Sequence, residues 1–260
     1  MIEEDRSDNV GLIGTVVKAG ALLREFTSSR PRWCTRELSE MLGFSRPTTH
    51  RLLATLQELG MVRRTDGAEW ILGTELIRLG AVASVGDGLR EKVRPFLTGL
   101  VREPGDSAYL FVPQDGRMFC IDRVMVASTL RLSLVEVGAS VRMGKGSASR
   151  VAAAFGAVPD SAQAFDPTEL GQIRAQGHAL NMEELAPGVC AISAPLLSRH
   201  GSLEGVICLG GLRDRFSGSA LYTHTAEIMA AAEDLSRTLG FIDAQFPPPL
   251  RAVEEVVERA

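Results

Sequence analysis

The sequence predicts an α+β fold in which an N-terminal winged helix-turn-helix precedes a larger C-terminal part of mixed helices and strands. Three apolar-striped segments with a helical period lie between residues 12 and 59 and are separated by short breaks. Two short β-like runs then flank Asp66-Gly67, a pair that is a strong signal for a β-hairpin. Beyond residue 88, strand-like runs alternate irregularly with helical segments. These three observations set the fold class.

The N-terminal helices are predicted at about 12–27, 35–42 and 46–59. The first is defined by apolar residues on one side, namely Val16, Val17, Ala21, Leu22, Leu23 and Phe26. Gly43 ends the second helix, because glycine accepts a positive φ without a Cβ penalty. Ser45 is a good N-cap for the third helix, and Pro47 lies in its first turn, where a missing N–H costs nothing. Runs at Met61–Arg64 and Glu69–Leu72 complete a winged helix-turn-helix.

Small polar and basic residues crowd the first turns of the third helix, where a recognition helix places its base-reading side chains in the major groove. Arginine can reach guanine or phosphate, and hydroxyl groups allow close approach. The alternative is an ordinary solvated Thr/Arg face on a helix pair. The candidate DNA-binding residues are Thr35, Ser45, Arg46, Thr48, Thr49, His50 and Arg51, with Arg63 and Arg64 on the wing.

Charge and composition favour a DNA-binding head on an acidic body. The formal net charge is −4, yet residues 10–80 carry ten Lys or Arg against seven Asp or Glu. Residues 1–9 are acidic, unlike a signal peptide, and no run approaches the ~20 apolar residues needed to span a membrane. The four cysteines include no CxxC pair. We expect a cytoplasmic protein that does not bind membranes.

The remaining elements divide the chain into a DNA-binding domain (10–73), a helical linker (74–88), a C-terminal domain (89–242) and a tail (243–260) that contains "FPPPL". Helices are expected at about 74–85, 89–102, 147–156, 167–176 and 218–239. Strands are expected at Tyr109–Pro113, Met118–Val124, Leu130–Val135, Val189–Leu197 and Leu203–Gly210. The last two strands would form a hairpin across "SRHGS".

The order of these pieces resembles the IclR family of bacterial transcription regulators over about residues 12 to 240. The likeness is carried by "RELSEMLGFSRPTTHRLLATLQELGMVRR" and by "WILGTELIRLG", with Leu-Gly pairs closing the wing and the next helix. A C-terminal segment, "IRAQGHALNMEELAPGVCAISAPLLSRHGSLEGVICLGG", resembles the part that lines the family's effector pocket.

The resemblance implies a GAF-like effector domain, in which helices flank a six-stranded antiparallel sheet. It also implies a homodimer or tetramer, a regulator of the repressor type that binds double-stranded operator DNA, and a small, often carboxylated effector. The implied effector-binding positions are Ser147, Ala148, Asn181, Cys190, Ile207 and Leu209.

Two departures from the family pattern affect that effector site. The family's small-residue loop aligns with 147–151, where its glycine-lysine pair becomes Ser149-Arg150. Two hydroxyl-bearing positions of the family fall on Ile207 and Leu209, which cannot donate hydrogen bonds to a carboxylate. We therefore expect a more apolar effector, aromatic or branched, or a pocket that no longer binds one.

Other chemistry is weakly indicated. The turn at 143–147, "MGKGS", lacks the spacing of a phosphate-binding loop, and the four histidines form no metal or triad motif. His178 and His200 adjoin glycines in predicted turns, which favours surface positions. Cys190 and Cys208 could meet across the hairpin as a redox pair, although such cysteines are more often small buried residues. We expect no catalytic residue, metal ion or cofactor; the alternative is a small-molecule enzyme with an accessory N-terminal domain.

Overall fold

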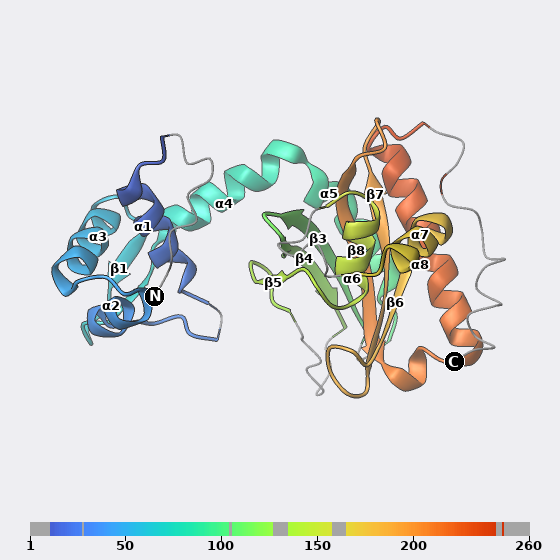
Figure 1. The fold of residues 1–260 in the computed structure, drawn as a ribbon, viewed down its shortest axis with the longest axis horizontal. Coiled ribbons are helices and arrows are strands. Elements are labelled where there is room, and N and C mark those ends of the chain that lie inside the picture. The colour runs from blue at the N-terminus through green and yellow to red at the C-terminus, as the bar shows by residue number, and fades with distance from the viewer. Residues whose placement is uncertain are drawn as a thin grey trace. The chain divides into compact units, whose positions relative to one another are not determined.

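The structure, a computed structural model, describes residues 11–27, 29–103, 106–126, 135–157, 165–242 and 246, with backbone alone for 84–87. The chain divides into two compact units that meet at Asp87 and Gly88 (Figure 1). Of the strand predicted at 130–135 only Val135 is described, as a bend; of the predicted tail only Phe246 is described.

The N-terminal unit contains a helix-turn-helix followed by a hairpin and a long helix. Its elements are α1 (Gly14–Arg24), α2 (Thr35–Leu42), α3 (Arg46–Glu58), β1 (Val62–Arg64), β2 (Trp70–Leu72) and α4 (Thr74–Asp87). β1 pairs antiparallel with β2, and the predicted Asp66-Gly67 turn lies between them. The winged helix-turn-helix predicted from the sequence is therefore confirmed.

The turn between α2 and α3 forms for the reasons expected from its residues. Gly43 takes a left-handed conformation with φ of 68°, and its N–H donates to the carbonyl of Ser39. The Ser45 hydroxyl accepts a hydrogen bond from the N–H of Thr48 at 3.3 Å and so caps α3. Pro47 lies in the first turn, where its ring fits the helix.

Both tryptophans of the chain anchor the core of the N-terminal unit. Trp33 and Trp70 form an isolated antiparallel bridge, and each is 3% exposed. The expected apolar stripe of α1 is only half buried: Leu22 and Phe26 enter this core, whereas Val16 is 64% exposed. The period of the sequence therefore identified the helix but not how much of it is covered.

Gly73 marks a close approach of two backbone segments in this unit. Its N–H donates to the carbonyl of Met61 at 2.8 Å, where the end of the wing meets the turn after α3. A Cβ on Gly73 would lie 2.1 Å from the carbonyl oxygen of Gly60. Only glycine fits this position without movement of the backbone.

The C-terminal unit is built on a six-stranded antiparallel sheet of order β5-β4-β3-β8-β7-β6. The strands are β3 (Ser107–Gln114), β4 (Arg117–Met125), β5 (Ser140–Arg142), β6 (Ala179–Met182), β7 (Val189–Leu197) and β8 (Leu203–Leu212). The helices are α5 (Leu89–Leu100), α6 (Ser147–Ala154), α7 (Pro167–Gln176) and α8 (Gly218–Thr238). The implied six-stranded sheet is confirmed; its short edge strands β5 and β6 were not among the strands that the sequence predicted.

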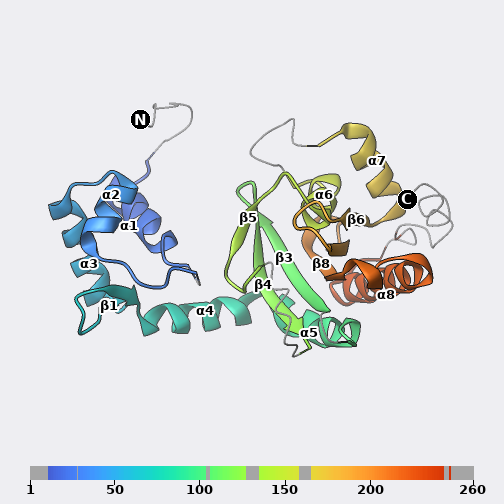
Figure 2. The same ribbon diagram turned by 90° about the horizontal axis from the view of Figure 1, so that it is seen from below.

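Helices cover both faces of this sheet, α5 and α8 on one and α6 and α7 on the other (Figure 2). Alternation along β3 assigns its side chains to the two sides: Ala108 and Leu110 pack toward α5 and α8, while Tyr109 and Phe111 face α6. The sheet therefore separates two hydrophobic cores.

A β-bulge changes the direction of the side chains within β4. The register between β3 and β4 shifts after Leu110, and Ile121 is the extra residue, so that Phe111 pairs with Cys120 and Leu110 with Asp122. Met118 and Cys120 belong to the core under α6. After the bulge, Asp122 faces α5, because one inserted residue reverses the alternation.

Asp122 is buried against α5, where two arginines neutralise it. Its Oδ1 atom lies 2.7 Å from a guanidinium nitrogen of Arg94 and 3.6 Å from one of Arg90, and it accepts a hydrogen bond from the N–H of Arg123. The carboxylate is 1% exposed, whereas both arginines reach solvent. Strand β4 is thereby tied to the first helix of the C-terminal unit.

Candidate DNA-binding surface and ligand cavity

The first turns of α3 present an exposed face without acidic residues. Ser45, Arg46, His50 and Arg51 are exposed and Thr48 is half-buried, with its hydroxyl 2.8 Å from that of Ser45. No Asp or Glu occurs between residues 43 and 57. Positive charge and hydroxyl groups are therefore concentrated at the N-terminal end of a helix, whose N–H groups also favour anions.

Thr49 does not belong to that face, and its assignment as a DNA contact was wrong. Its side chain is fully buried on the side of α3 that faces the core, and its hydroxyl donates a hydrogen bond to the carbonyl of Ser45 at 3.2 Å. Helical geometry explains the error: residues 48, 50 and 51 turn outward, whereas residue 49 falls on the side of Leu52 and Leu53.

The wing adds two more exposed arginines. In β1, Val62 is buried, and Arg63 and Arg64 are both exposed. The indole N–H of Trp70 donates to the hydroxyl of Thr35 at 3.0 Å and so joins the wing to α2. Thr35 is half-buried but retains its own hydroxyl proton for a further hydrogen bond.

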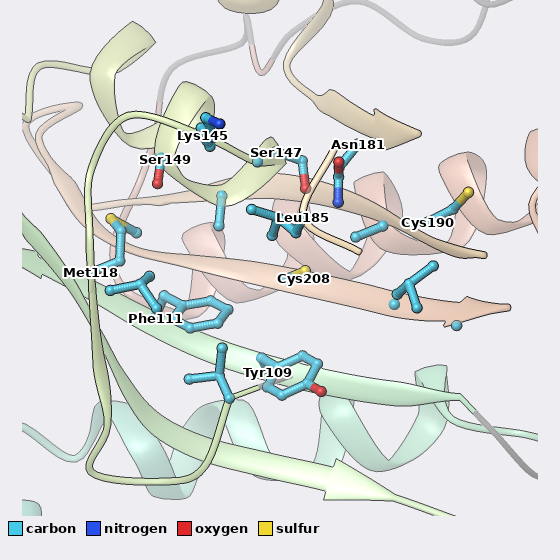
Figure 3. A pocket seen from close by; sticks show the side chains of 18 of the residues that line it. Tyr109, Phe111, Met118, Lys145, Ser147, Ser149, Asn181, Leu185, Cys190 and Cys208 are labelled. Atoms are coloured by element: carbon cyan, nitrogen blue, oxygen red, sulfur yellow. The ribbon is translucent and has the colours of Figure 1, made fainter. Parts of the chain in front are cut away.

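The C-terminal unit contains a cavity of about 800 Å³, counting its open mouth, between the sheet and the start of α6 (Figure 3). Its wall on the sheet side is apolar. Tyr109 and Phe111 stack there with ring centroids 5.6 Å apart and planes inclined by 21°. Burial raises the pKa of the Tyr109 hydroxyl above its usual range, so the ring stays neutral at physiological pH.

A small polar group lies beside this apolar wall. The hydroxyl oxygens of Ser147 and Ser193 are 2.8 Å apart and fully buried. Burial raises the pKa of the neighbouring Cys208 thiol to about 11, although both serines hydrogen-bond to it and lower the value. Cys208 is therefore a neutral, weakly reactive thiol near pH 7.

Asn181 offers the cavity a hydrogen-bond donor. Its Oδ1 accepts the N–H of Glu184 at 3.0 Å, which fixes the orientation of the amide. Its Nδ2 is buried and has no hydrogen-bond partner among the described residues. In Figure 3 this nitrogen is directed toward the cavity. A buried donor without a partner costs about 1–3 kcal/mol, which a ligand acceptor would recover.

The charges around the cavity have one sign. Arg142 and Lys145 line it and are both exposed, whereas the described lining residues include no Asp or Glu. The segment 143–147, which the sequence suggested as a turn, brings Lys145 and Gly146 to the lining of the cavity. The cavity can therefore take an anion whose body is apolar.

Four of the six predicted effector positions border the cavity, namely Ser147, Ala148, Asn181 and Cys190, although the Cys190 side chain packs into the core beneath α5 and α8. The other two, Ile207 and Leu209, do not. Both are fully buried in the core beneath α5 and α8, and the cavity is instead lined by Cys208 and Gly210. Side chains alternate between the two faces of the sheet along a strand. The predicted positions on β8 were one residue out of step, so they fell on the face opposite the cavity. Ile207 and Leu209 therefore no longer support the inference that the effector is apolar.

Cys190 and Cys208 lie on opposite faces of the sheet. Cys190 packs with the core beneath α5 and α8, and Cys208 with the core beneath α6. A disulfide between them is therefore excluded in this fold. His178 also differs from expectation: it is 4% exposed, and burial lowers its pKa.

Sequence reasoning missed the aromatic wall and Leu185. Tyr109 and Phe111 alternate with Ala108 and Leu110, and that period of two could have indicated a second face of β3. Leu185 lies in the loop between β6 and β7, where no periodic signal points to a cavity. Among the described residues, no cluster of His, Cys, Asp or Glu could hold a metal ion, and no helix is long and apolar enough to cross a membrane.

Two parts of the chain match known families. Residues 15–66 match the IclR helix-turn-helix domain, and residues 164–237 match the bacterial transcriptional regulator IclR C-terminal domain. The chain is 26% identical to the glycerol operon regulatory protein of Streptomyces coelicolor, over 88% of this chain and 97% of that protein. It is 24% identical to the transcriptional repressor IclR of Escherichia coli, over 88% and 91%.

Solved structures share the fold. An IclR transcriptional regulator from Alicyclobacillus acidocaldarius aligns with a TM-score of 0.76 at 21% identity, over 88% of this chain and all of that one. An IclR homolog from Microbacterium hydrocarbonoxydans, crystallised with 4-hydroxybenzoate, aligns with a TM-score of 0.68 at 16% identity, over 86% and 98%. With both characteristic domains in place and in order, the chain belongs to the IclR family of bacterial transcription regulators.

Proposed function

We propose that this protein represses transcription by binding operator DNA through α3 and the wing, and that a small aromatic or branched carboxylate in the C-terminal cavity controls that binding. The observation that carries the proposal is a basic, acid-free helix end on a winged helix, in a chain whose second unit has a cavity with one sign of charge.

The DNA contacts divide into two kinds. Arg46, Thr48, His50 and Arg51 extend from the first turns of α3 and would read base edges in the major groove. Ser45 and Thr35 would donate to phosphates. Arg63 and Arg64 on the wing would lie along the backbone and supply affinity that depends on salt rather than on sequence.

The effector class follows from the lining of the cavity. Tyr109 and Phe111 offer a flat apolar wall against which a ring can stack. The exposed lining residues Arg142 and Lys145 favour a carboxylate, and the Asn181 amide supplies a donor for an oxygen of the ligand. The corrected alternation of β8 therefore leads to the same apolar class of effector, by way of other residues.

Self-association through the N-terminal unit is part of the proposal. Large apolar side chains are exposed just before α1 (Leu12 and Ile13), on α1 (Val16 and Val17) and on α4 (Ile77, Leu79 and Val82), where they would otherwise face water. Two copies joined by such faces would carry two recognition helices, which matches half-sites about one helical turn apart. A homodimer, or a tetramer made of two dimers, is the expected assembly.

Fluorescence anisotropy tests the DNA proposal. The purified chain is titrated against labelled DNA from upstream of its own gene and against a scrambled fragment, at several salt concentrations. Arg51→Ala should cost about 1–3 kcal/mol on the specific fragment alone, whereas Arg64→Ala should weaken both fragments and reduce the salt slope by about one. Arg237→Ala, on α8, is the charge-matched control. Equal binding of all variants would refute the assignment of the surface.

Thermal-shift measurements test the effector class. Benzoate and 4-methylbenzoate should raise the melting temperature, whereas uncharged benzamide and small acids such as lactate should have little effect. Asn181→Leu should weaken benzoate about tenfold by removing the donor, with Gln57→Leu on α3 as control. A panel in which only small hydroxy or keto acids stabilise the protein would refute the aromatic class, and no stabilisation by any acid would indicate a regulator without a working pocket.

A further inference from the structure

Leu185 is a large apolar residue that lines the cavity although it lies in an exposed loop. The loop joins β6 to β7 at residues 183–188, and Leu185 is 52% exposed. In Figure 3 it lies across the cavity from Tyr109 and Phe111, near Ser147. Leu185 therefore lies between the interior of the cavity and solvent. We call the 183–188 loop that carries it the closing wall of the cavity.

Gly146 makes room for Leu185. A Cβ built on Gly146 would lie 2.9 Å from Cδ1 of Leu185, and φ at Gly146 is +80°. The glycine therefore allows both the turn before α6 and the packing of Leu185 directly on its backbone. The loop and the start of α6 close together over one side of the cavity.

Two acidic side chains at the start of the loop hold it in place. Glu183 accepts the N–H of Gly188 at 3.0 Å and pairs with Arg213 at 2.9 Å. Glu184 pairs with Arg150 at 2.6 Å, and Arg150 is itself mostly buried. Glu183 and Gly188 both adopt positive φ, so the loop turns sharply at each end and its middle residues form one compact unit.

We propose that Leu185 determines which effectors the protein accepts: the 183–188 loop is a closing wall, and Leu185 limits the length of the ligand that fits against Tyr109 and Phe111. The inference rests on the proposed effector function, because it assigns a selecting residue to that same cavity. A shorter side chain at position 185 extends the cavity toward solvent, so ligands with longer substituents then fit.

Asn181 connects ligand and loop. Its Nδ2 faces the cavity without a partner, while its Oδ1 holds the N–H of Glu184 in the loop. A ligand oxygen on Nδ2 fixes the amide that supports the closed loop. Bound ligand and closed wall therefore stabilise each other.

The test needs no known effector, because Cys208 lines the cavity and reports access to it. The full chain is treated with methyl or benzyl methanethiosulfonate. The small thiolate fraction of Cys208 attacks the sulfenyl sulfur, methanesulfinate leaves and a mixed disulfide forms, so labelling is slow and its rate is compared between variants and reagents. Trypsin separates Cys208 from the other cysteines because Arg199 and Arg213 flank it, so mass spectrometry gives its labelling rate alone.

Leu185→Ala should speed labelling by the benzyl reagent at least tenfold and by the methyl reagent less than threefold, because the wall selects by size. Met182→Ala is the matched control, since Met182 is exposed on β6 and does not line the cavity. Glu184→Ala, which releases the loop, should speed both reagents. Equal acceleration of both reagents by Leu185→Ala, or no acceleration, would overturn the assignment.

A ligand series separates this inference from the proposed function. If wild type binds benzoate but not 4-butylbenzoate, Leu185→Ala should bind both, which supports both proposals. If Leu185→Ala still rejects 4-butylbenzoate while wild type binds benzoate, the selecting role fails and the effector class stands. If no benzoate binds any variant, the effector class fails, and the ratio of the two labelling rates still decides the role of Leu185.

Discussion

Gly73→Ala should unfold the winged helix more easily than any conservative change elsewhere in it. A Cβ at this position would lie 2.1 Å from the Gly60 carbonyl oxygen and 3.0 Å from the carbonyl carbon of Met61. Both neighbours are backbone atoms and cannot rotate away. The wing and the turn after α3 must therefore separate by about 1 Å, since real Cβ atoms essentially never approach closer than 3.0 Å.

The cost has two parts. Overpacking of this kind costs about 1–3 kcal/mol. Separation also stretches the hydrogen bonds from Gly73 N–H to Met61 and from Glu75 N–H to Gly60, each worth about 1 kcal/mol. A loss of about 3 kcal/mol follows, which corresponds to a fall in melting temperature of about 12 °C or more for a domain of this size.

Tryptophan fluorescence measures this change in the N-terminal unit alone, because Trp33 and Trp70 are the only tryptophans of the chain and both are buried there. Gly80→Ala is the control: a Cβ on Gly80, in α4, meets no atom within 4 Å, and alanine should strengthen the helix by up to about 1 kcal/mol. A Gly73→Ala transition within 2 °C of wild type would refute the close-approach argument.

Three further changes test other parts of the structure. Thr49→Ala should lower the free energy of unfolding by about 1 kcal/mol through the lost hydrogen bond to Ser45, with DNA affinity by anisotropy unchanged; a large loss of affinity would restore Thr49 to the DNA surface. Burial lowers the pKa of His178, so the unfolded chain binds a proton at a higher pH than the folded chain does, and the free energy of unfolding should fall as the pH drops through about 6.5. His178→Gln should flatten that decline, as measured by urea unfolding followed by circular dichroism. An unchanged dependence on pH in the variant would contradict this origin. Ile77→Asp should reduce the mass in sedimentation to that of a smaller assembly, whereas an unchanged mass would exclude α4 from the interface.

The sequence predicted most of the N-terminal unit because local signals fix it. Gly43 and Ser45 each specify their own conformation, and the Asp66-Gly67 pair specifies a hairpin. The burial of Thr49 was missed because a helix face is set by a rotation of 100° per residue, and polar residue types do not reveal which side meets the core.

The cavity was harder to predict because it depends on the register of strands distant in sequence. Ile207 and Leu209 differ from Cys208 and Gly210 by a single step, and that step decides which core they enter. The contribution of Leu185 depends on where the β6–β7 loop folds back onto Gly146, and residues far apart in the chain determine that contact.

The bulge at Ile121 divides β4 into two stretches that can change independently. Before the bulge, Met118 lines the cavity and Cys120 packs in the core beneath α6, whereas Asp122 after it holds α5 through Arg90 and Arg94. Substitutions before the bulge can therefore retune what the protein recognises and leave the attachment of α5 intact. A library confined to that first stretch would alter the core beneath α6 and leave the contacts of Asp122 with Arg90 and Arg94 in place. Deleting Ile121 would restore regular pairing between β3 and β4, with Asp122 still opposite Leu110 on the side of α5.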